Sequence, residues 1–141
     1  MLFRSREMKE IKHRLILRNK IVGYEKWYSG SFSEDMGWNA HPLWLCSKDN
    51  GSSWSPTFIF HTDKNLFTGF KDKFGKEIYE GDILEITNQT SELKGSKVSV
   101  VFKEGCFCDG YYGWRLSQHK EYNLEIIGNI YENSELLTPP H

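Results

Sequence analysis

The chain has 141 residues, enough for one domain or for two small subdomains that fold without disulfides or metals. Its 18 Lys and Arg nearly balance 19 Asp and Glu, and a formal net charge of −1 argues against a protein whose main task is to wrap nucleic acid. No apolar run reaches the roughly 20 residues of a membrane-spanning helix and no signal peptide opens the chain, which together with three Cys predicts a cytoplasmic protein with reduced thiols.

The N-terminal half consists of short apolar stretches between turn signals. Residues 1–7 form a ragged extension, and residues 8–66 are expected to form an N-terminal subdomain. Its strands are predicted from β-branched and aromatic residues, at Ile11–Leu17, Ile21–Tyr28 and Leu43–Cys46. For the first of these a helix is the alternative, since Ile11, Leu15 and Arg18 also fit a helical repeat.

Segments rich in Gly, Ser, Asp and Asn connect these strands and are predicted to be loops. A turn is expected at Asn19-Lys20, and the long segment Ser29–Ala40 reads as loop. Ser47–Pro56 is a second loop, with a tight-turn signal at Asn50-Gly51. Thr57–His61 is rich in β-forming residues and closes this half.

Residues 67–137 are predicted to form a second subdomain, followed by a tail at residues 138–141. Two tight turns, Asp72–Gly75 and Glu80–Asp82, introduce it. Its strands are predicted at Ile83–Ile86, Lys97–Lys103 and Leu124–Tyr131, with bent strands over Cys106–Leu116. Gly128 is expected to form a bulge, and Asn133–Leu137 a single helical turn.

The signal that dominates this half is Thr68–Ile86, Thr-Gly-Phe-Lys-Asp-Lys-Phe-Gly-Lys-Glu-Ile-Tyr-Glu-Gly-Asp-Ile-Leu-Glu-Ile. This stretch resembles the signature of the YopX family of phage and prophage proteins. The tail Leu124–Leu137, Leu-Glu-Ile-Ile-Gly-Asn-Ile-Tyr-Glu-Asn-Ser-Glu-Leu-Leu, resembles the closing words of the same family. The resemblance implies an α+β N-terminal part, an SH3-like C-terminal β-barrel, and action inside a bacterial cell. It implies no agreed activity.

The residues of the signature are individually explained as architecture. Asp72 and Asp82 are expected to cap turns, while Ile78, Ile83 and Ile86 are expected to point to the core. Short strands, frequent turns and the lack of a long amphipathic helix predict a mainly β protein, α+β overall. The N-terminal subdomain is expected to be loop-rich.

Catalysis is the weakest functional interpretation. Asp82 followed by Glu92-x-Lys94 mimics the spacing of a metal-dependent nuclease, in which an acid and a Glu-x-Lys pair hold Mg²⁺ and orient water. Glu92 and Lys94 lie in a predicted loop, however, and Asp82 is better explained by its turn. We therefore expect no catalytic residue.

A metal site is also weakly supported. Cys106 and Cys108 place two thiols on one face of a strand, and His41 with Cys46 or His119 could complete a tetrahedral zinc site. The Cys-x-Cys spacing is not that of the common zinc knuckle. We expect partly buried thiols and no cofactor.

Exposed cations and aromatic rings give two binding hypotheses. Three lysines flank a turn with an aromatic residue, at Lys71, Lys73, Phe74 and Lys76, where they could contact phosphates while the ring stacks on a base. The simpler interpretation is a solvated hairpin whose lysines discourage edge pairing. Aromatic residues make up 15% of the chain, and Trp38 and Trp54 lie in predicted loops near Trp27, Tyr28 and Trp44.

Burial in the core is the ordinary fate of such tryptophans, but exposed clusters mark protein contacts or ligand stacking. The sequence thus predicts a non-enzymatic phage or prophage accessory protein that binds a host or phage protein, as a homo-oligomer or a monomer. A nucleic-acid or small-nucleotide binding protein that counters a host defence is the alternative. A metal-dependent nuclease ranks last.

Overall fold

The fold is described from a computed structural model over residues 10–28, 31–33, 37–40, 43–87, 92–120 and 123–137. The predicted extension and tail, residues 1–7 and 138–141, lie outside these ranges. The chain divides into two units, residues 1–64 and residues 65–141, and each is described by itself.

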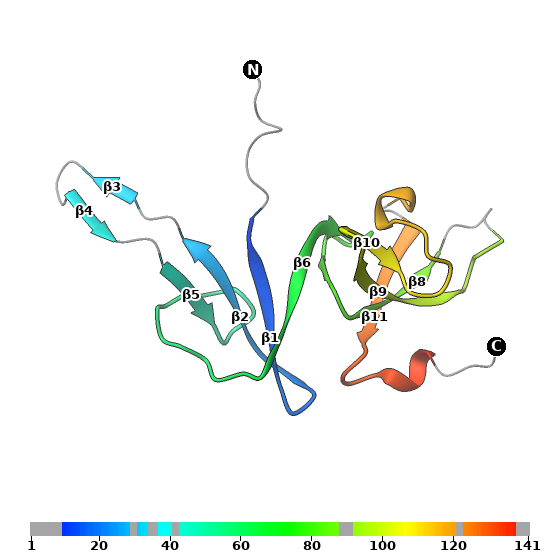
Figure 1. Cartoon of the computed structure of the whole chain (residues 1–141), viewed down its shortest axis with the longest axis horizontal. Coiled ribbons are helices and arrows are strands. Elements are labelled where there is room, and N and C mark those ends of the chain that lie inside the picture. The colour runs from blue at the N-terminus through cyan, green and yellow to red at the C-terminus, as the bar shows by residue number, and fades with distance from the viewer. Residues whose placement is uncertain are drawn as a thin grey trace, which may run out of the picture. The chain divides into compact units, whose positions relative to one another are not determined.

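The first unit is built on an antiparallel sheet in which the order of the strands is β5-β2-β1, followed by the start of β6 (Figure 1). The strands are β1 (Lys12–Leu17), β2 (Lys20–Tyr28), β5 (Leu43–Ser47) and β6 (Asp63–Lys71). Arg18 and Asn19 connect β1 to β2 with positive φ angles of 54° and 62°, as a type I′ hairpin turn requires. The predicted strands are confirmed, and the helical alternative for the first is wrong.

The segment Ser29–Ala40, predicted to be loop, contains a two-stranded ribbon. Its strands are β3 (Ser31–Ser33) and β4 (Gly37–Ala40), and Phe32 pairs with Trp38 in their register. The loop prediction is wrong here because the hydrogen bonds of such a ribbon come from the backbone, which Gly and Ser supply as well as any residue.

Thr57–His61, although rich in β formers, forms no strand and instead covers one face of the sheet. Ile59 is buried in a cluster with Leu15 and Cys46. A Cβ atom at Gly23 would lie 2.6 Å from Ile59 Cδ1 and 2.7 Å from the Ser47 carbonyl oxygen. Gly23 therefore allows this segment to pack directly on β2.

The second unit contains an antiparallel sheet in the order β10-β9-β8-β11 (Figure 1). Its elements are β7 (Glu77–Tyr79), β8 (Asp82–Ile86), β9 (Lys97–Lys103), β10 (Cys106–Asp109), η2 (Leu116–Gln118), β11 (Leu124–Asn129) and η4 (Ser134–Leu137). Between β11 and β8 the register shifts at Ile126 and Gly128, which confirms the predicted bulge.

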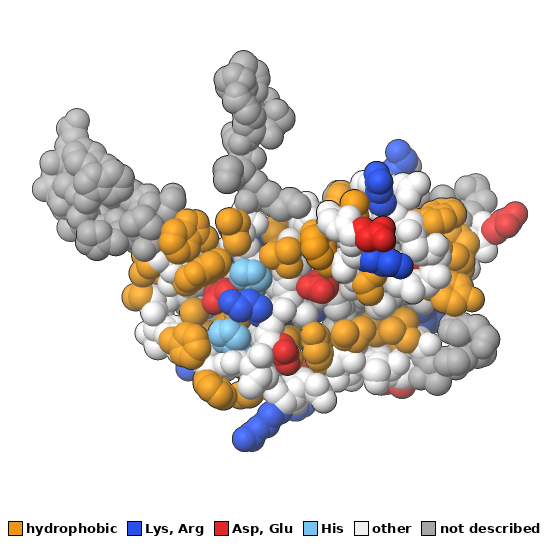
Figure 2. Space-filling model, in the orientation of Figure 1, with side chains coloured by type: hydrophobic (Ala, Val, Ile, Leu, Met, Phe, Trp, Pro, Cys, Tyr) orange, Lys and Arg blue, Asp and Glu red, His pale blue; other side chains and the backbone are white. Residues whose placement is uncertain are grey.

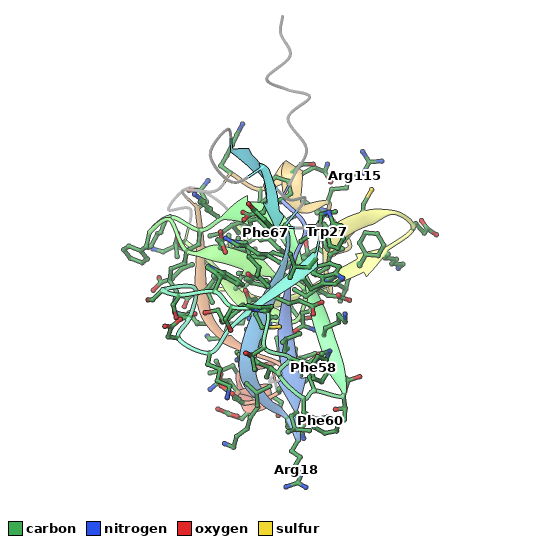
Figure 3. All side chains as sticks on the ribbon, turned by 90° about the vertical axis from the view of Figure 1, so that its left-hand side faces the viewer. Arg18, Trp27, Phe58, Phe60, Phe67 and Arg115 are labelled. Carbon is green, nitrogen blue, oxygen red and sulfur yellow. The ribbon has the colours of Figure 1, made fainter. Side chains whose placement is uncertain are left out.

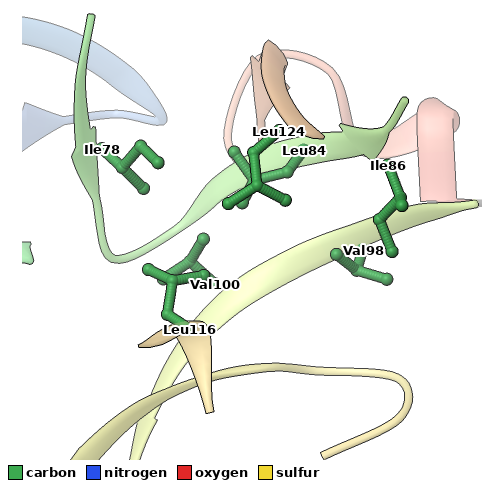
Figure 4. Packing of buried hydrophobic residues seen from close by; sticks show 7 residues of the cluster. All are labelled: Ile78, Leu84, Ile86, Val98, Val100, Leu116 and Leu124. Atoms are coloured by element: carbon green, nitrogen blue, oxygen red, sulfur yellow. The ribbon is translucent and has the colours of Figure 1, made fainter. Parts of the chain in front are cut away.

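The core of the second unit lies on this sheet. Its buried side chains come from β7, β8, β9, β11 and η2, and Figure 4 shows them pointing toward one another: Ile78, Leu84, Ile86, Val98, Val100, Leu116 and Leu124. Ile78, Ile83 and Ile86 are at most 2% exposed, as predicted. Burying an aliphatic side chain of this size contributes about 1.5–3 kcal/mol, so this cluster is the main apolar support of the unit.

The predicted SH3-like barrel is not what the described strands form. They form an open four-stranded sheet and a hairpin of β6 with β7, and no described ladder closes them into a barrel. The implied α+β N-terminal part also differs, since the described part of the first unit contains strands without helices. Within the described ranges there is no helix of the length and apolar character that crossing a membrane requires.

The Asp72 carboxylate orders the turn between β6 and β7. Its Oδ1 accepts the N–H groups of Phe74 and Lys76, each at 2.9 Å, and its Oδ2 accepts the Ile126 N–H at 3.1 Å. Asp82 acts similarly and accepts the Tyr79 N–H at 2.8 Å. Both residues are buried, and both cap turns as predicted.

Asp72→Ala should lower the free energy of unfolding by about 2–4 kcal/mol, because three backbone N–H groups lose a charged acceptor. Asp72→Asn should cost less, since the amide keeps one acceptor oxygen. Urea denaturation measures both. Glu92→Ala, at an exposed turn residue, is the control and should stay within about 0.5 kcal/mol of wild type. Equal stability of Asp72→Ala and this control would contradict the assignment.

Candidate functional site

The predicted lysine-rich tip lies on the turn between β6 and β7, where Phe74, Lys71 and Lys76 are exposed. Lys73 Nζ lies 5.2 Å from the centroid of the Phe74 ring and 3.4 Å from Glu125 Oε1. The tip therefore presents an aromatic ring beside a cation, as predicted, but Glu125 partly neutralises that cation.

Of the two predicted loop tryptophans, Trp54 is half-buried. Lys26 Nζ lies 4.4 Å from its ring centroid, so the ring packs under a cation of β2. The backbone of Trp38 belongs to β4, and its side chain lies outside the description.

The candidate zinc ligands that the structure describes are not arranged as a metal site. Cys106 is half-buried, Cys108 is buried, and both are free thiols. His119 Nε2 lies 3.1 Å from Asp109 Oδ2, and His41 falls outside the described residues. Among the residues that the structure covers, no group of three His, Cys, Asp or Glu side chains could hold a metal.

An aspartate also orders the loop after β5. The Asp49 carboxylate accepts hydrogen bonds from the Ser47 hydroxyl at 2.7 Å and from the Ser53 hydroxyl at 2.5 Å, and these bonds lower its pKa to about 2. A shallow open pocket lies beside it, lined in part by Cys46 and Ile59. Burial raises the pKa of the Cys46 thiol, which therefore stays protonated and is a poor nucleophile.

A second loop, after β10, is held by a fully buried carboxylate. Asp109 accepts the N–H groups of Tyr111 and Gly113, both at 3.1 Å, as well as the Trp114 N–H at 3.3 Å. The Trp114 ring stacks on His119 with centroids 5.5 Å apart. Tyr111 and Trp114 are thus displayed on an ordered loop of the second unit.

The most unusual electrostatic feature is a buried carboxylate on the sheet of the first unit. Glu25 on β2 stands opposite His13 on β1, and its Oε2 lies 2.9 Å from His13 Nδ1. Lys64 Nζ, from the start of β6, lies 2.8 Å from the same oxygen. We call these three residues the Glu25 cluster. An unpaired buried carboxylate would be strongly unfavourable, so these partners are what makes its burial tolerable.

The two partners of Glu25 differ in charge. The pKa of His13 is lowered, chiefly by burial and by the Lys64 ammonium, and the Glu25 carboxylate only partly opposes this. Lys64 is therefore the partner that balances the negative charge of Glu25 at neutral pH.

Aromatic side chains surround this cluster. The Trp44 ring lies 5.4 Å from His13 and packs edge-on against Trp27 at 5.3 Å, while Phe58 lies 5.4 Å from His61. We call Trp27, Trp44, Phe58 and Phe60 the aromatic face. Figure 2 shows apolar side chains around histidine, lysine and acidic side chains, and Figure 3 labels Trp27, Phe58 and Phe60.

The members of the aromatic face are well exposed for such large apolar side chains. Trp27 and Trp44 are 40% and 38% exposed, and Phe58 and Phe60 are each 66% exposed. Ordered pairs such as Trp27 with Trp44 lose little conformational freedom on binding, which suits them to contact another molecule. Here exposed aromatic rings lie beside a buried charged side chain of the first unit.

The sequence predicted an aromatic patch around the loop residues Trp38 and Trp54 with Trp27 and Trp44 nearby, but it did not predict the Glu25 cluster. Period two along β2 puts Glu25 and Trp27 on one face, a signal that was present in the sequence. The pairing of Glu25 with His13, and of Trp27 with Trp44, depends on strand register across β1, β2 and β5 and has no local signature.

Comparison with known proteins supports the fold. The family model described as YopX protein matches residues 48–138. The crystal structure of protein EF1440 from Enterococcus faecalis is similar, with 23% identity and a TM-score of 0.57, over 90% of this chain and 97% of that chain. At this identity the similarity shows a shared fold alone. No curated protein matches the chain.

His13 should make stability depend on pH. Because its pKa is lowered in the folded state, the unfolded chain binds the proton more tightly, with a pKa of about 6.5. The contribution of neutral His13 is therefore present above that pKa and is lost as the pH falls from there through the lowered pKa of the folded state. The free energy of unfolding should fall more steeply between pH 7.5 and pH 5.5 in wild type than in His13→Gln. Parallel curves would contradict the shift, and Lys20→Gln on the same hairpin is the control.

Proposed function

The chain belongs to the YopX protein family, and we propose that it is a non-enzymatic phage or prophage accessory protein that binds a host or phage protein through its aromatic face. The observation that carries this proposal is the exposure of Trp27, Trp44, Phe58 and Phe60, of which Trp44 lies beside His13 and Lys64 of the Glu25 cluster. Exposed aromatic rings are typical of interaction sites, because covering them removes apolar surface from water at about 25 cal/mol per Å².

The composition of this face suits a protein partner better than a small apolar ligand. Aromatic anchors around a polar centre are the usual make-up of the best-binding part of a protein interface. The Glu25 cluster supplies the polar centre, since a buried charge rejects partners that leave it unpaired. The aromatic rings would supply most of the binding affinity. The Glu25 cluster would discriminate between partners that can pair with its charge and partners that cannot.

The position of the face relative to the family match also supports this division of labour. The match begins at residue 48, so it includes Phe58 and Phe60 but neither Trp27 nor Trp44. The shared signature builds the second unit, whereas the proposed contact surface draws on strands that precede the match.

The double variant Trp27→Ser/Trp44→Ser should lose the partner that wild type captures from a bacterial host lysate, with affinity reduced at least about 100-fold, because two anchors of about 2 kcal/mol or more are removed. Quantitative mass spectrometry of captured proteins identifies the partner, and titration with the purified partner gives the affinity. Tyr111→Ser, an exposed aromatic of the second unit, is the matched control and should bind as wild type.

Undiminished capture by the double variant, with an unchanged melting temperature, would rule out the aromatic face as the contact. If size-exclusion chromatography instead shows that wild type self-associates and the double variant does not, the partner is a second copy of the chain.

One observation favours a second candidate function, binding of a single-stranded nucleic acid at the β6–β7 tip. Phe74 is exposed with a lysine ammonium over its ring, and Lys71 and Lys76 flank it. A ring that stacks on a base between cations that contact phosphates is a common single-strand binding arrangement. The pairing of Lys73 with Glu125 weakens this alternative.

If the tip binds a single strand through three phosphate contacts, affinity should fall roughly 20-fold between 50 and 200 mM salt. Lys71→Gln/Lys73→Gln/Lys76→Gln should abolish most of that dependence, and Phe74→Ala should remove the stacking contribution of about 1–3 kcal/mol. Fluorescence anisotropy with a labelled oligonucleotide measures both. Lys103→Gln controls for net charge, and an equal loss in this control would show only diffuse attraction.

A further inference from the structure

We propose that Glu25 and Trp44 form a receptor for an arginine side chain of the partner, and that Lys64 fills this receptor in the free protein. The inference rests on the proposed function, because it names the chemical group by which a protein partner is recognised. It assigns Lys64 the role of an internal stand-in for the partner's cation.

The first support is that one cation touches both halves of the receptor. Lys64 Nζ lies 2.8 Å from Glu25 Oε2 and 5.8 Å from the centroid of the Trp44 ring. A carboxylate and an aromatic face that share one cation are the elements by which proteins recognise ammonium and guanidinium groups. Because the Lys64 ammonium lies near both Glu25 and Trp44, a positive charge is accommodated between these two side chains.

The second support is the contrast in burial between the two charges. The Glu25 side chain is 7% exposed, whereas the Lys64 side chain is 44% exposed. The carboxylate is thus fixed in the sheet, while the lysine reaches it from solvent and can return there at little cost in hydration. Once Lys64 leaves, a cation must replace it, because a buried carboxylate without a counter-charge is costly.

The other groups around Glu25 do not remove this need. His13 contacts the same oxygen at 2.9 Å, but burial and Lys64 lower its pKa, so it donates a hydrogen bond without a full positive charge. In the sheet Glu25 lies opposite His13 on β1 and Cys46 on β5, and the Lys64 side chain reaches it from β6, which lies beyond β1.

Arginine fits this receptor better than the lysine that fills it. At 5.8 Å the ammonium lies near the roughly 6 Å limit of a cation–π contact, so Lys64 uses the Trp44 ring poorly. A planar guanidinium can donate two hydrogen bonds to a carboxylate and stack on an indole ring at the same time. Trp27 packs edge-on against Trp44 and holds that ring in place.

The receptor lies within the aromatic face, so an arginine that enters it would arrive with the surface that covers the rings. Arg is enriched in protein interfaces and among the residues that dominate binding energy. The partner surface is therefore expected to present an arginine among apolar side chains.

The test uses N-acetyl-arginine-N-methylamide as the probe, with the uncharged citrulline analogue as its matched control. Lys64→Ala in the full chain should bind the arginine probe about tenfold or more tightly than wild type does, because a tethered competitor has been removed. Glu25→Gln/Lys64→Ala should bind neither probe. Binding is followed by the NMR shifts of the indole N–H groups, with melting temperatures as the check on folding.

Equal binding of both probes to Lys64→Ala, or equal affinity of wild type and Lys64→Ala for the arginine probe, would overturn the inference. Lys64→Met keeps the apolar stem of the side chain and repeats the test if the alanine variant unfolds. The outcome is separable from the proposed function. Suppose that partner capture requires Trp27 and Trp44, but Lys64→Ala does not prefer the arginine probe. This result would support the aromatic face as the contact surface and would contradict the arginine receptor.

Discussion

The structure of the second unit depends on how the Asp72 carboxylate joins two distant parts of the sequence. One oxygen holds the turn at Phe74 and Lys76, and the other holds the Ile126 N–H of β11. The Lys73 N–H donates to the Leu124 carbonyl beside it, at 2.9 Å. The signature and the closing tail are therefore adjacent in space, and the carboxylate is the constraint that keeps the hairpin on the sheet edge.

This explains why the signature predicted the fold better than it predicted a site. Turn residues act locally, so Asp72, Asp82 and the bulge at Gly128 could be read from the sequence. Barrel closure and the β3–β4 ribbon could not, because both depend on which backbone edges meet. The residue types in Ser29–Ala40 do not predict strand pairing. The residues of β7 likewise do not predict that its hairpin with β6 lies outside the four-stranded sheet.

The binding surface shows the same limit more sharply. Exposed lysines around Phe74 were predicted because they adjoin in sequence, whereas the Glu25 cluster gathers residues 13, 25 and 64. Its geometry depends on the register of β1 with β2, which shifts between Leu15 and Ile16, so the turn alone does not reveal that His13 lies opposite Glu25. Trp27 and Trp44 meet through the register of β2 with β5, which composition alone does not reveal.

The carboxylates of the two units differ in the groups that donate hydrogen bonds to them. In the second unit, buried carboxylates accept backbone N–H groups and thereby order turns. The examples are Asp72, Asp82 and Asp109. In the first unit, the Glu25 carboxylate accepts side-chain donors, of which one is a half-exposed lysine that solvent can also satisfy. A carboxylate that accepts backbone N–H groups cannot change partner without unfolding its turn, whereas one paired with a half-exposed lysine side chain can. That difference is why the proposed recognition belongs to Glu25 and not to the turn-capping carboxylates of the second unit.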